Sequence, residues 1–534
     1  MKKWGVLITL SLAMFIIVID TTIMNVSISV LVVDLNTTVT GVQSAISIYA
    51  MVMAASMLIG GKLADIIGPK RTFLIGLVIY GVGTTVASFS NSLSMLIVGW
   101  SILEGIGAAL MIPTIQVLLR DAYKEGDLAF AYGIIGAVSA VGAAVGPIVG
   151  GFFTTYISWR WAFRTELLIV IVVLVLSRYL QADRAPERRP KFDYVGALFS
   201  VLGWSSIVLG ILFIQQYGFF LAKEPFILGP WEIAPLGLSI SPILLGFGFV
   251  MIMLLFRWER HLEDQNGDGL FRPSIFKTVG LKSGITVRFL QMGMTAGFLY
   301  IVPLMLQLTF EYTAMETGLA LMPFSISLLI MAIVGSRLSA RFYANRIIII
   351  GFVLAIAGLS SIAASITPTA TPQELVLGAV FGIGLGLIAS QLLNLVLSAV
   401  QPEQTAEAAG LNSTFEQLGN AIGVALIGTV MLGALSFGLQ EKITASTVIP
   451  DEAKIPLIEA VDESVQLMSD SQLTAAFEEA GADEAMTQEI NDLYAISRTT
   501  AFQAGVSLLA YIGIIALIVA LWLPKKKLVT EPSP

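Results

Sequence analysis

The sequence of 534 residues contains no cysteine and a single histidine. Without cysteine, the chain has no disulfide, no thiol nucleophile and no cysteine metal ligand. Charged residues are also scarce, at 13%, whereas hydrophobic residues make up 56% and the mean hydropathy is +0.85. Because an ordinary soluble domain does not sustain this composition over such a length, we predict a polytopic helical membrane protein.

Several site patterns are missing as well. No GxxxxGKS or GxxxxGKT phosphate loop occurs, so ATP hydrolysis by this chain is not indicated. No nucleophile elbow and no His, Asp or Glu group with metal-site spacing is visible, and His261 stands in a polar connector, where a solvated surface histidine is expected. We therefore expect that the protein is not an enzyme and that it has no cofactor and no metal. We also expect no nucleic-acid partner, because the basic residues are spread through short loops as topology signals and do not form a patch.

Long apolar runs predict about fourteen membrane spans, because one span needs about 20 apolar residues. Most Lys and Arg residues fall in connections on one side, which predicts two cytoplasmic termini and an even number of spans. The first run is too long for a signal peptide and lacks a small-residue cleavage site, so we expect it to remain as a span. The runs are 4–32, 43–60, 72–90, 94–116, 130–154, 161–181, 194–216, 236–256, 284–308, 315–335, 347–366, 375–398, 407–436 and 501–524.

The sizeable region outside these runs is the acidic segment 437–500, which the topology places outside the cell. Part of it has helical periodicity, which predicts a short helical hairpin that caps the outer mouth. The alternatives are a solvated loop that only connects two spans, or a vestibule that attracts cations.

Two glycine-rich elements interrupt the apolar pattern. The first, GKLADIIGPKR at Gly61–Arg71, joins the second and third runs, and Asp65 stands close enough to Lys62, Lys70 and Arg71 for charge pairs to pin one helix end against another. The second, GAAVGPIVGG, has glycines at four-residue spacing, which share one helix face and let a neighbouring backbone approach, and its proline is expected to kink that face. Its members are Gly142, Gly146, Pro147, Gly150 and Gly151.

Both elements resemble motifs of the major facilitator superfamily. The first resembles the loop between its second and third helices, although Ile66 and Pro69 stand where basic residues are usual. The resemblance implies a conformational latch, whereas the second element is similar to the pattern of the superfamily's antiporters and implies exchange rather than symport. The matching latch residues are Gly61, Leu63, Ala64, Asp65, Gly68, Lys70 and Arg71.

The first run carries Asp20, Thr22 and Asn25 in a D-x-T-x-x-N sequence, which resembles the first helix of the fourteen-span drug:proton antiporters. This likeness covers nearly the whole chain. It implies an all-α fold of two six-helix bundles, at 1–190 and 261–534, with two added helices at 191–260 between them. Further matches are Gln43, Tyr49, Ser158–Phe163 and Ala409–Gly423.

The chain departs from that family in its fourth and sixth helices. Ser101 stands where an Arg is usual, and Glu104 where a Gln is usual, followed by Gly105. In the sixth helix, Glu166 and Leu168 replace an Asn and a Pro. A basic residue often implicated in proton transfer is thus missing, and two acids are added.

Asp20, Glu104 and Glu166 are therefore three acids inside predicted spans. A carboxylate in hydrocarbon costs a few kcal/mol, so such residues face a cavity or bind a proton. Our hypothesis is that a proton and a cationic substrate compete for these carboxylates, with Asp20 as the first choice for the proton site. The alternative is that Glu104 or Glu166 only hydrogen-bonds a neighbouring helix.

Polar residues also recur in the thirteenth run, where Asn412 and Glu416 share a helix face. They are candidates for the substrate path, and an equal alternative is that the amides hold helices together. Arg288, one turn inside the ninth run, is expected to extend to the cytoplasmic lipid headgroups, and the alternative is that it binds an anion. The loop Gly335–Arg346 resembles a degenerate second copy of the latch and supports a repeated architecture.

The sequence thus predicts a monomeric secondary transporter in the cell membrane of a prokaryote. By resemblance, it exports lipophilic or cationic drugs by alternating access and uses the proton gradient as its energy source. The alternative is export of a lipid or an endogenous metabolite, with proton coupling left open.

Overall fold

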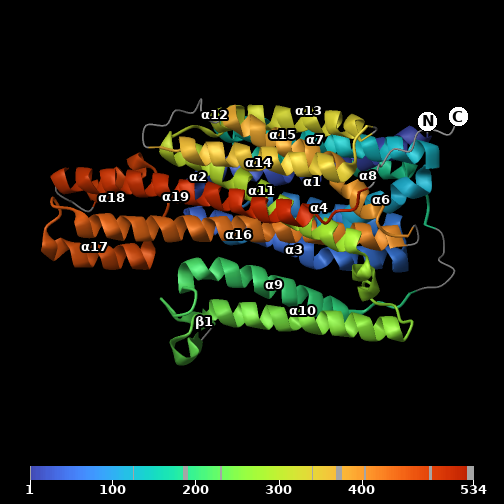
Figure 1. Ribbon diagram of the computed structural model, residues 1–534, viewed down its shortest axis with the longest axis horizontal. Coiled ribbons are helices and arrows are strands. Elements are labelled where there is room, and N and C mark those ends of the chain that lie inside the picture. The colour runs from blue at the N-terminus through green and yellow to red at the C-terminus, as the bar shows by residue number, and fades with distance from the viewer. Residues whose placement is uncertain are drawn as a thin grey trace.

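A computed structural model describes residues 2–123, 125–183, 190–228, 231–339, 341–367, 376–401, 404–479 and 484–525. The described chain is almost entirely helical (Figure 1). Its two short strands, β1 (Phe226–Leu228) and β2 (Trp231–Ile233), pair antiparallel, with Ile227 opposite Glu232. The all-helical fold that the composition predicts is therefore confirmed.

The first helix group, α1 to α8, forms one part of the bundle. Its long helices contact one another, with α1 against α7 and α8, and α4 against α6 and α8. Its elements are α1 (Lys2–Val26), α2 (Ile28–Asp34), α3 (Val39–Ile67), α4 (Pro69–Ser88), α5 (Leu93–Leu96), the π-helix η1 (Ile97–Glu104), α6 (Gly105–Ala122), α7 (Glu125–Tyr156), α8 (Arg160–Leu176) and the 3₁₀ turn η2 (Ser177–Tyr179).

The second helix group, α11 to α16 with α19, packs in a similar way. In this group α11 contacts α16 and α19, and α15 contacts α13 and α14. Its elements are α11 (Val279–Thr309), α12 (Ala314–Ala320), α13 (Met322–Leu338), α14 (Ala344–Ser365), α15 (Gly378–Leu397), α16 (Thr405–Ala445) and α19 (Glu484–Ala520).

A helical hairpin, α9 (Tyr194–Tyr217) and α10 (Ile240–Asp264), lies along the outside of both groups (Figure 1). The 3₁₀ turn η3 (Pro235–Gly237) precedes α10, and η4 (Pro273–Lys277) follows it. Helix α9 contacts α3 of the first group and α16 of the second. At this seam, the Gln215 amide donates to Gln43 Oε1 at 3.4 Å and to Thr429 Oγ1 at 3.2 Å.

Twelve of the described helical stretches are long and apolar enough to cross a bilayer, or up to thirteen if α12 and α13, bent by 41°, form one span. Helix α8 occupies the sixth predicted span but has only 17 residues. At 1.5 Å per residue it measures about 26 Å, slightly less than the hydrocarbon thickness of about 30 Å. The count of fourteen therefore stays a prediction.

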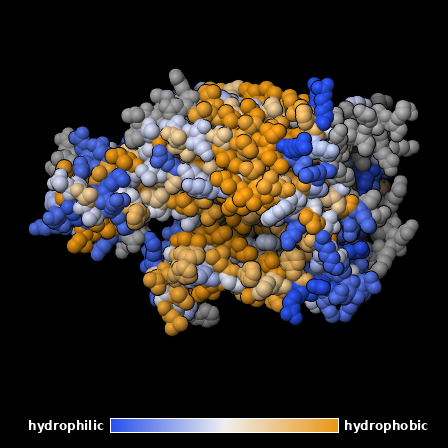
Figure 2. Space-filling view, in the orientation of Figure 1, coloured by the Kyte–Doolittle hydropathy of each residue, from blue (hydrophilic) through white to orange (hydrophobic). Residues whose placement is uncertain are grey.

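The surface is divided in the way that a bilayer requires. Figure 2 shows hydrophobic side chains in a broad belt across the middle of the molecule, with hydrophilic ones at the right-hand end and over the protrusion on the left. Helix α1 begins at the right-hand end in Figure 1, and α19 runs from the left toward that end. The protein is a multi-pass membrane protein whose membrane normal follows the long axis of the bundle.

The described part of the acidic segment 437–500 is helical, as the periodicity predicts, and is not a plain loop. Helix α16 continues to Ala445, and α17 (Asp451–Ser464) and α18 (Asp470–Glu479) project beyond the bundle (Figure 1). The Arg498 guanidinium, 1% exposed, donates to Met468 O at 2.8 Å and pairs with Asp470 at 2.9 Å. These contacts attach the projection to α19.

Candidate functional site

The three acids inside the predicted spans meet in one place. Asp20 comes from α1, Glu104 from the end of η1 and Glu166 from α8, and one carboxylate oxygen of each lies within 4.8 Å of the others. The three residues are 1%, 0% and 3% exposed. The carboxylates are therefore enclosed inside the first helix group.

Each carboxylate accepts a hydrogen bond from an uncharged donor. Trp100 Nε1 donates to both oxygens of Asp20 at 2.9 Å. Thr84 Oγ1 donates to Glu104 Oε1 at 2.6 Å, and Tyr80 Oη donates to Glu166 Oε2 at 3.3 Å. Within the described part of the chain, none of the three acids forms an ion pair with Lys or Arg.

The π-helix η1 brings the acids together, because it carries both Trp100 and Glu104 on the face toward α1 and α4. Wide π turns of this kind are rare and occur frequently at functional sites. At Gly83 of α4, a Cβ would lie 2.6 Å from Gly99 O, so only glycine allows this close approach. Ser101, which stands where the family has Arg, donates to Ala45 O of α3 at 2.7 Å and makes a helix contact instead of supplying charge.

Sequence reasoning missed the residues that surround the acids. Trp100, Thr84 and Tyr80 have no distinctive spacing relative to the three acids, and only packing shows that each contacts one of them. The sequence offered one weak signal for these donors: polar side chains inside predicted spans tend to pair with an intramembrane acid. Asn25 lies farther along α1, where its amide donates to Thr21 O at 2.8 Å.

In the second helix group, Glu416 has a basic partner. Arg288 Nη2 lies 2.6 Å from Glu416 Oε2, and its Nε lies 3.1 Å from the same oxygen. The expectation that Arg288 extends to the lipid headgroups is therefore wrong, because the carboxylate on α16 is a nearer and stronger partner. Asn412, one turn before Glu416, is 2% exposed and its Oδ1 has no hydrogen-bond partner among the described residues.

The predicted latch has a different anion at its centre. Asp183, after α8, accepts from the backbone of Lys70 at 2.8 Å and of Arg71 at 3.1 Å, and thus caps α4. Its carboxylate also lies 3.8 Å from Arg71 Nε. The expected pairing of Asp65 with Lys70 and Arg71 is not found among the described residues: Arg71 lies beside Asp183, and Lys70 Nζ donates to Leu180 O at 3.0 Å.

The glycines of the latch differ in their roles. Gly68 has φ +99°, and a Cβ there would clash with the Asp183 carboxylate, so the turn requires glycine. A Cβ at Gly61, within α3, would meet nothing within 4 Å, so the turn does not depend on it. Lys62 Nζ donates to Gly269 O at 2.8 Å, beyond the end of α10.

The second glycine element packs as its spacing predicts. Gly142, Gly146 and Gly150 of α7 face α1, and a Cβ at Gly150 would lie 2.9 Å from Ile23 Cα. On the next part of α7, Gly151 lies against Ala314 of α12, which belongs to the second helix group. Helix α7 is continuous through Pro147. The element thus joins α1, α7 and the second group closely.

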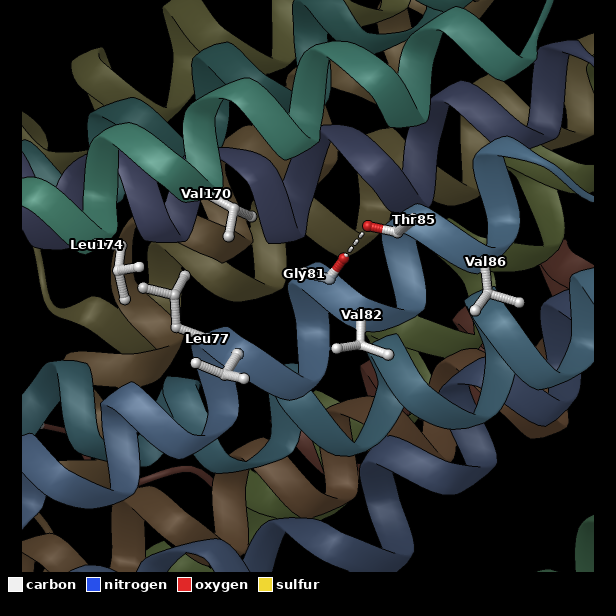
Figure 3. A pocket seen from close by; sticks show the side chains of 8 residues that line it. Leu77, Gly81, Val82, Thr85, Val86, Val170 and Leu174 are labelled. Atoms are coloured by element: carbon white, nitrogen blue, oxygen red, sulfur yellow. Dashed lines mark hydrogen bonds between the residues drawn. The ribbon is translucent and has the colours of Figure 1, made fainter.

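A hollow of about 280 Å³ lies on the outer face of the first group, between α4 and α8 (Figure 3). Its lining is apolar except for Thr85, which donates to Gly81 O at 2.7 Å. Val78 and Val82 are 54% and 51% exposed, so the hollow opens on the surface of the protein. The hollow carries no ionisable group, so we place the candidate site at the enclosed acids.

Comparison with known proteins gives related transporters and resistance proteins. The chain is 27% identical over 458 residues to the puromycin resistance protein of Streptomyces alboniger, covering 84% of this chain and 86% of that protein. It is 26% identical over 434 residues to the tetracenomycin C resistance and export protein of Streptomyces glaucescens, covering 80% and 76%.

The fold comparison agrees. A bacterial homologue of the human lysosomal transporter Spinster, in an inward-facing conformation, superimposes with a TM-score of 0.56 at 14% identity, covering 98% of both chains. Residues 10–424 match the Major Facilitator Superfamily model. The chain therefore belongs to the Major Facilitator Superfamily, whose members are membrane transporters rather than enzymes.

Proposed function

We propose that this protein is a proton-coupled exporter of lipophilic or cationic drugs that works by alternating access. The names of two relatives, a puromycin resistance protein and a tetracenomycin C resistance and export protein, support the substrate class. The observation that carries the proposal is the enclosure of Asp20, Glu104 and Glu166 without a basic partner among the described residues. Intramembrane acids of this kind mark ion and proton pathways.

Asp20 is the proposed proton site, and Glu104 and Glu166 exchange the proton with it. The enclosure in this conformation admits a proton but not a bulky cation, so we propose that proton and drug act through helix positions rather than by sharing the same oxygens. Helix α1 connects the two events, because it carries Asp20 and also packs on the glycine face of α7. A change of charge at Asp20 then shifts the equilibrium between the conformations in which α1 packs differently on α7.

The accompanying proposals concern topology and conformational change. We place the protein as a monomer with fourteen spans and cytoplasmic termini in the cell membrane of a prokaryote, and the start of α1 at the end toward which α19 runs supports termini on one side (Figure 1). The turn at Gly68 and Asp183 is the proposed latch. Asn412 and the Arg288–Glu416 pair are the proposed contribution of the second group to the substrate path.

The test is proton movement in proteoliposomes with an acidic interior. Addition of lipophilic cations such as ethidium should alkalinise the interior with the wild type, and Asp20→Asn should abolish this response. Glu441→Gln, which removes an exposed acid from α16, is the control that should leave it intact. An unimpaired Asp20→Asn variant would refute the proton site, and silence of the wild type toward all cations would favour a lipid or metabolite exporter.

A further inference from the structure

The enclosed acids also have the geometry of a metal site. Since the three carboxylate oxygens lie within 4.8 Å of one another, some point lies within about 2.8 Å of all three. Calcium is bound by protein oxygens at about 2.3–2.6 Å, a separation that small adjustments of these side chains reach. The acids come from three different helical elements, so a shared ion would connect α1, η1 and α8.

A fourth oxygen faces the cluster without a partner. The Tyr49 hydroxyl belongs to a side chain that is 3% exposed, and it lies beside the Asp20 carboxylate without a hydrogen bond of regular geometry to any described residue. Its ring stacks on Trp100 with 5.1 Å between centroids. Glu104 Oε2 is likewise buried and unpartnered. Buried polar atoms rarely stay unpartnered, so these two oxygens point to an additional ligand.

The ligand set selects the kind of ion. Every candidate donor is oxygen, without nitrogen or sulfur, which suits hard cations rather than zinc or copper. The three carboxylates bring up to three negative charges into a site with no basic partner among the described residues, and a cation offsets them. Magnesium fits less well, because it requires six oxygens at about 2.0–2.1 Å and keeps several waters.

We propose that Asp20, Glu104 and Glu166, with the Tyr49 hydroxyl, bind one hard metal cation of the size of Ca²⁺ or Na⁺. The inference rests on the proposed function for its role in transport, because the same carboxylates serve both. Binding itself is measured without transport, so the two proposals can fail separately.

The experiment measures equilibrium binding of radioactive calcium and radioactive sodium to the purified full-length protein in detergent, at about pH 8, where free carboxylic acids are ionised. We expect calcium or sodium, or both, to bind saturably with one ion per chain. Magnesium should displace the bound ion only weakly. Glu104→Gln and Glu166→Gln should each weaken binding by about tenfold or more. Tyr49→Phe, which removes only the hydroxyl, should weaken it less.

Glu441→Gln is the matched control, since it removes a carboxylate far along α16 and should bind like the wild type. A size-exclusion profile confirms that each variant is folded. Absence of saturable binding by either ion, or equal binding by the wild type and both Gln variants, would overturn the proposal. If ion binding is absent while drug-driven proton movement persists, the metal site is refuted and the proposed function stands. If the ion binds but drugs cause no proton movement, the metal site stands and the proposed function is refuted.

Discussion

The two helix groups differ in how they accommodate the carboxylates of their predicted spans. In the first group, Asp20, Glu104 and Glu166 accept hydrogen bonds from Trp100, Thr84 and Tyr80, and none has a basic partner among the described residues. In the second group, Arg288 lies 2.6 Å from Glu416 and neutralises it. The charge of a paired carboxylate is already compensated by its basic partner, whereas an unpaired buried carboxylate is stabilised when it binds a proton or a cation. The difference favours the first group as the place of the proposed proton exchange, and it leaves the paired Glu416 of the second group without that role.

The largest expected effect comes from breaking the Arg288–Glu416 pair. Arg288→Met leaves the Glu416 carboxylate without its partner, with side chains only 12% and 25% exposed in the wild type. We expect a loss of about 3 kcal/mol of stability, because a partly buried charge is left uncompensated. Thermal unfolding in detergent measures it.

The rescue makes this test specific. Adding Glu416→Gln to Arg288→Met should recover most of the lost stability, since no charge then remains. Glu104→Gln in the first group should be neutral or stabilising, because it removes one of three mutually repelling acids. Equal destabilisation by Arg288→Met and Glu104→Gln would contradict the comparison between the groups.

A smaller effect is expected from the donor to Asp20. Trp100→Phe keeps a ring to stack on Tyr49 but removes the N–H that reaches both Asp20 oxygens. The negative carboxylate loses charge-assisted hydrogen bonds, so the pH profile of drug-driven proton movement should move toward alkaline pH by about one unit. The measurement is the initial rate across a pH series.

Trp159→Phe is the matched control for that substitution. Trp159 Nε1 also donates to a carboxylate, Asp34 Oδ2, at 2.8 Å, but this pair lies outside the acid cluster. Its loss should leave the pH profile in place. A displaced profile with Trp159→Phe, or an unmoved one with Trp100→Phe, would show that the Asp20 donor does not set the response.

The smallest effect concerns a carboxylate in water, outside the membrane. The Ser471 hydroxyl and backbone N–H hold the pKa of Glu311 below its usual range, and their contact connects α18 to the end of α11. Because the pKa is lowered by folding, this stabilisation is present above the usual Glu pKa of about 4.3 and is lost as the pH falls through the lowered value.

Glu311→Gln should therefore speed hydrogen exchange in α18 slightly at neutral pH and have no effect in strong acid. Solvent screening keeps the effect small, since exposed charges contribute little. Glu452→Gln, an exposed substitution on α17, should change nothing. If the hydrogen-exchange protection of α18 at neutral pH is the same with and without the Glu311 carboxylate, this contact does not stabilise α18.

Local patterns predicted the packing motifs well. The four-residue spacing of Gly142, Gly146 and Gly150 predicted a face for close approach, and α1 lies against that face. The turn at Gly68 followed from its glycine, but its partner Asp183 did not, because it is more than one hundred residues away. Arg288 was misjudged for the same reason: its partner stands on another helix.

The sequence by itself determined the class of this protein, its run of apolar helices and the small-residue faces that bring them together, because hydropathy and helical spacing depend only on residues that are near in the chain. Only the tertiary structure decided that Asp20, Glu104 and Glu166 share one enclosure and that Glu416 does not. No metal-site spacing is visible in the sequence, yet three helical elements bring three carboxylate oxygens within 4.8 Å of one another. The distance between side chains on different helices is set by how those helices pack, including the π turn at η1, and that packing has no local signature.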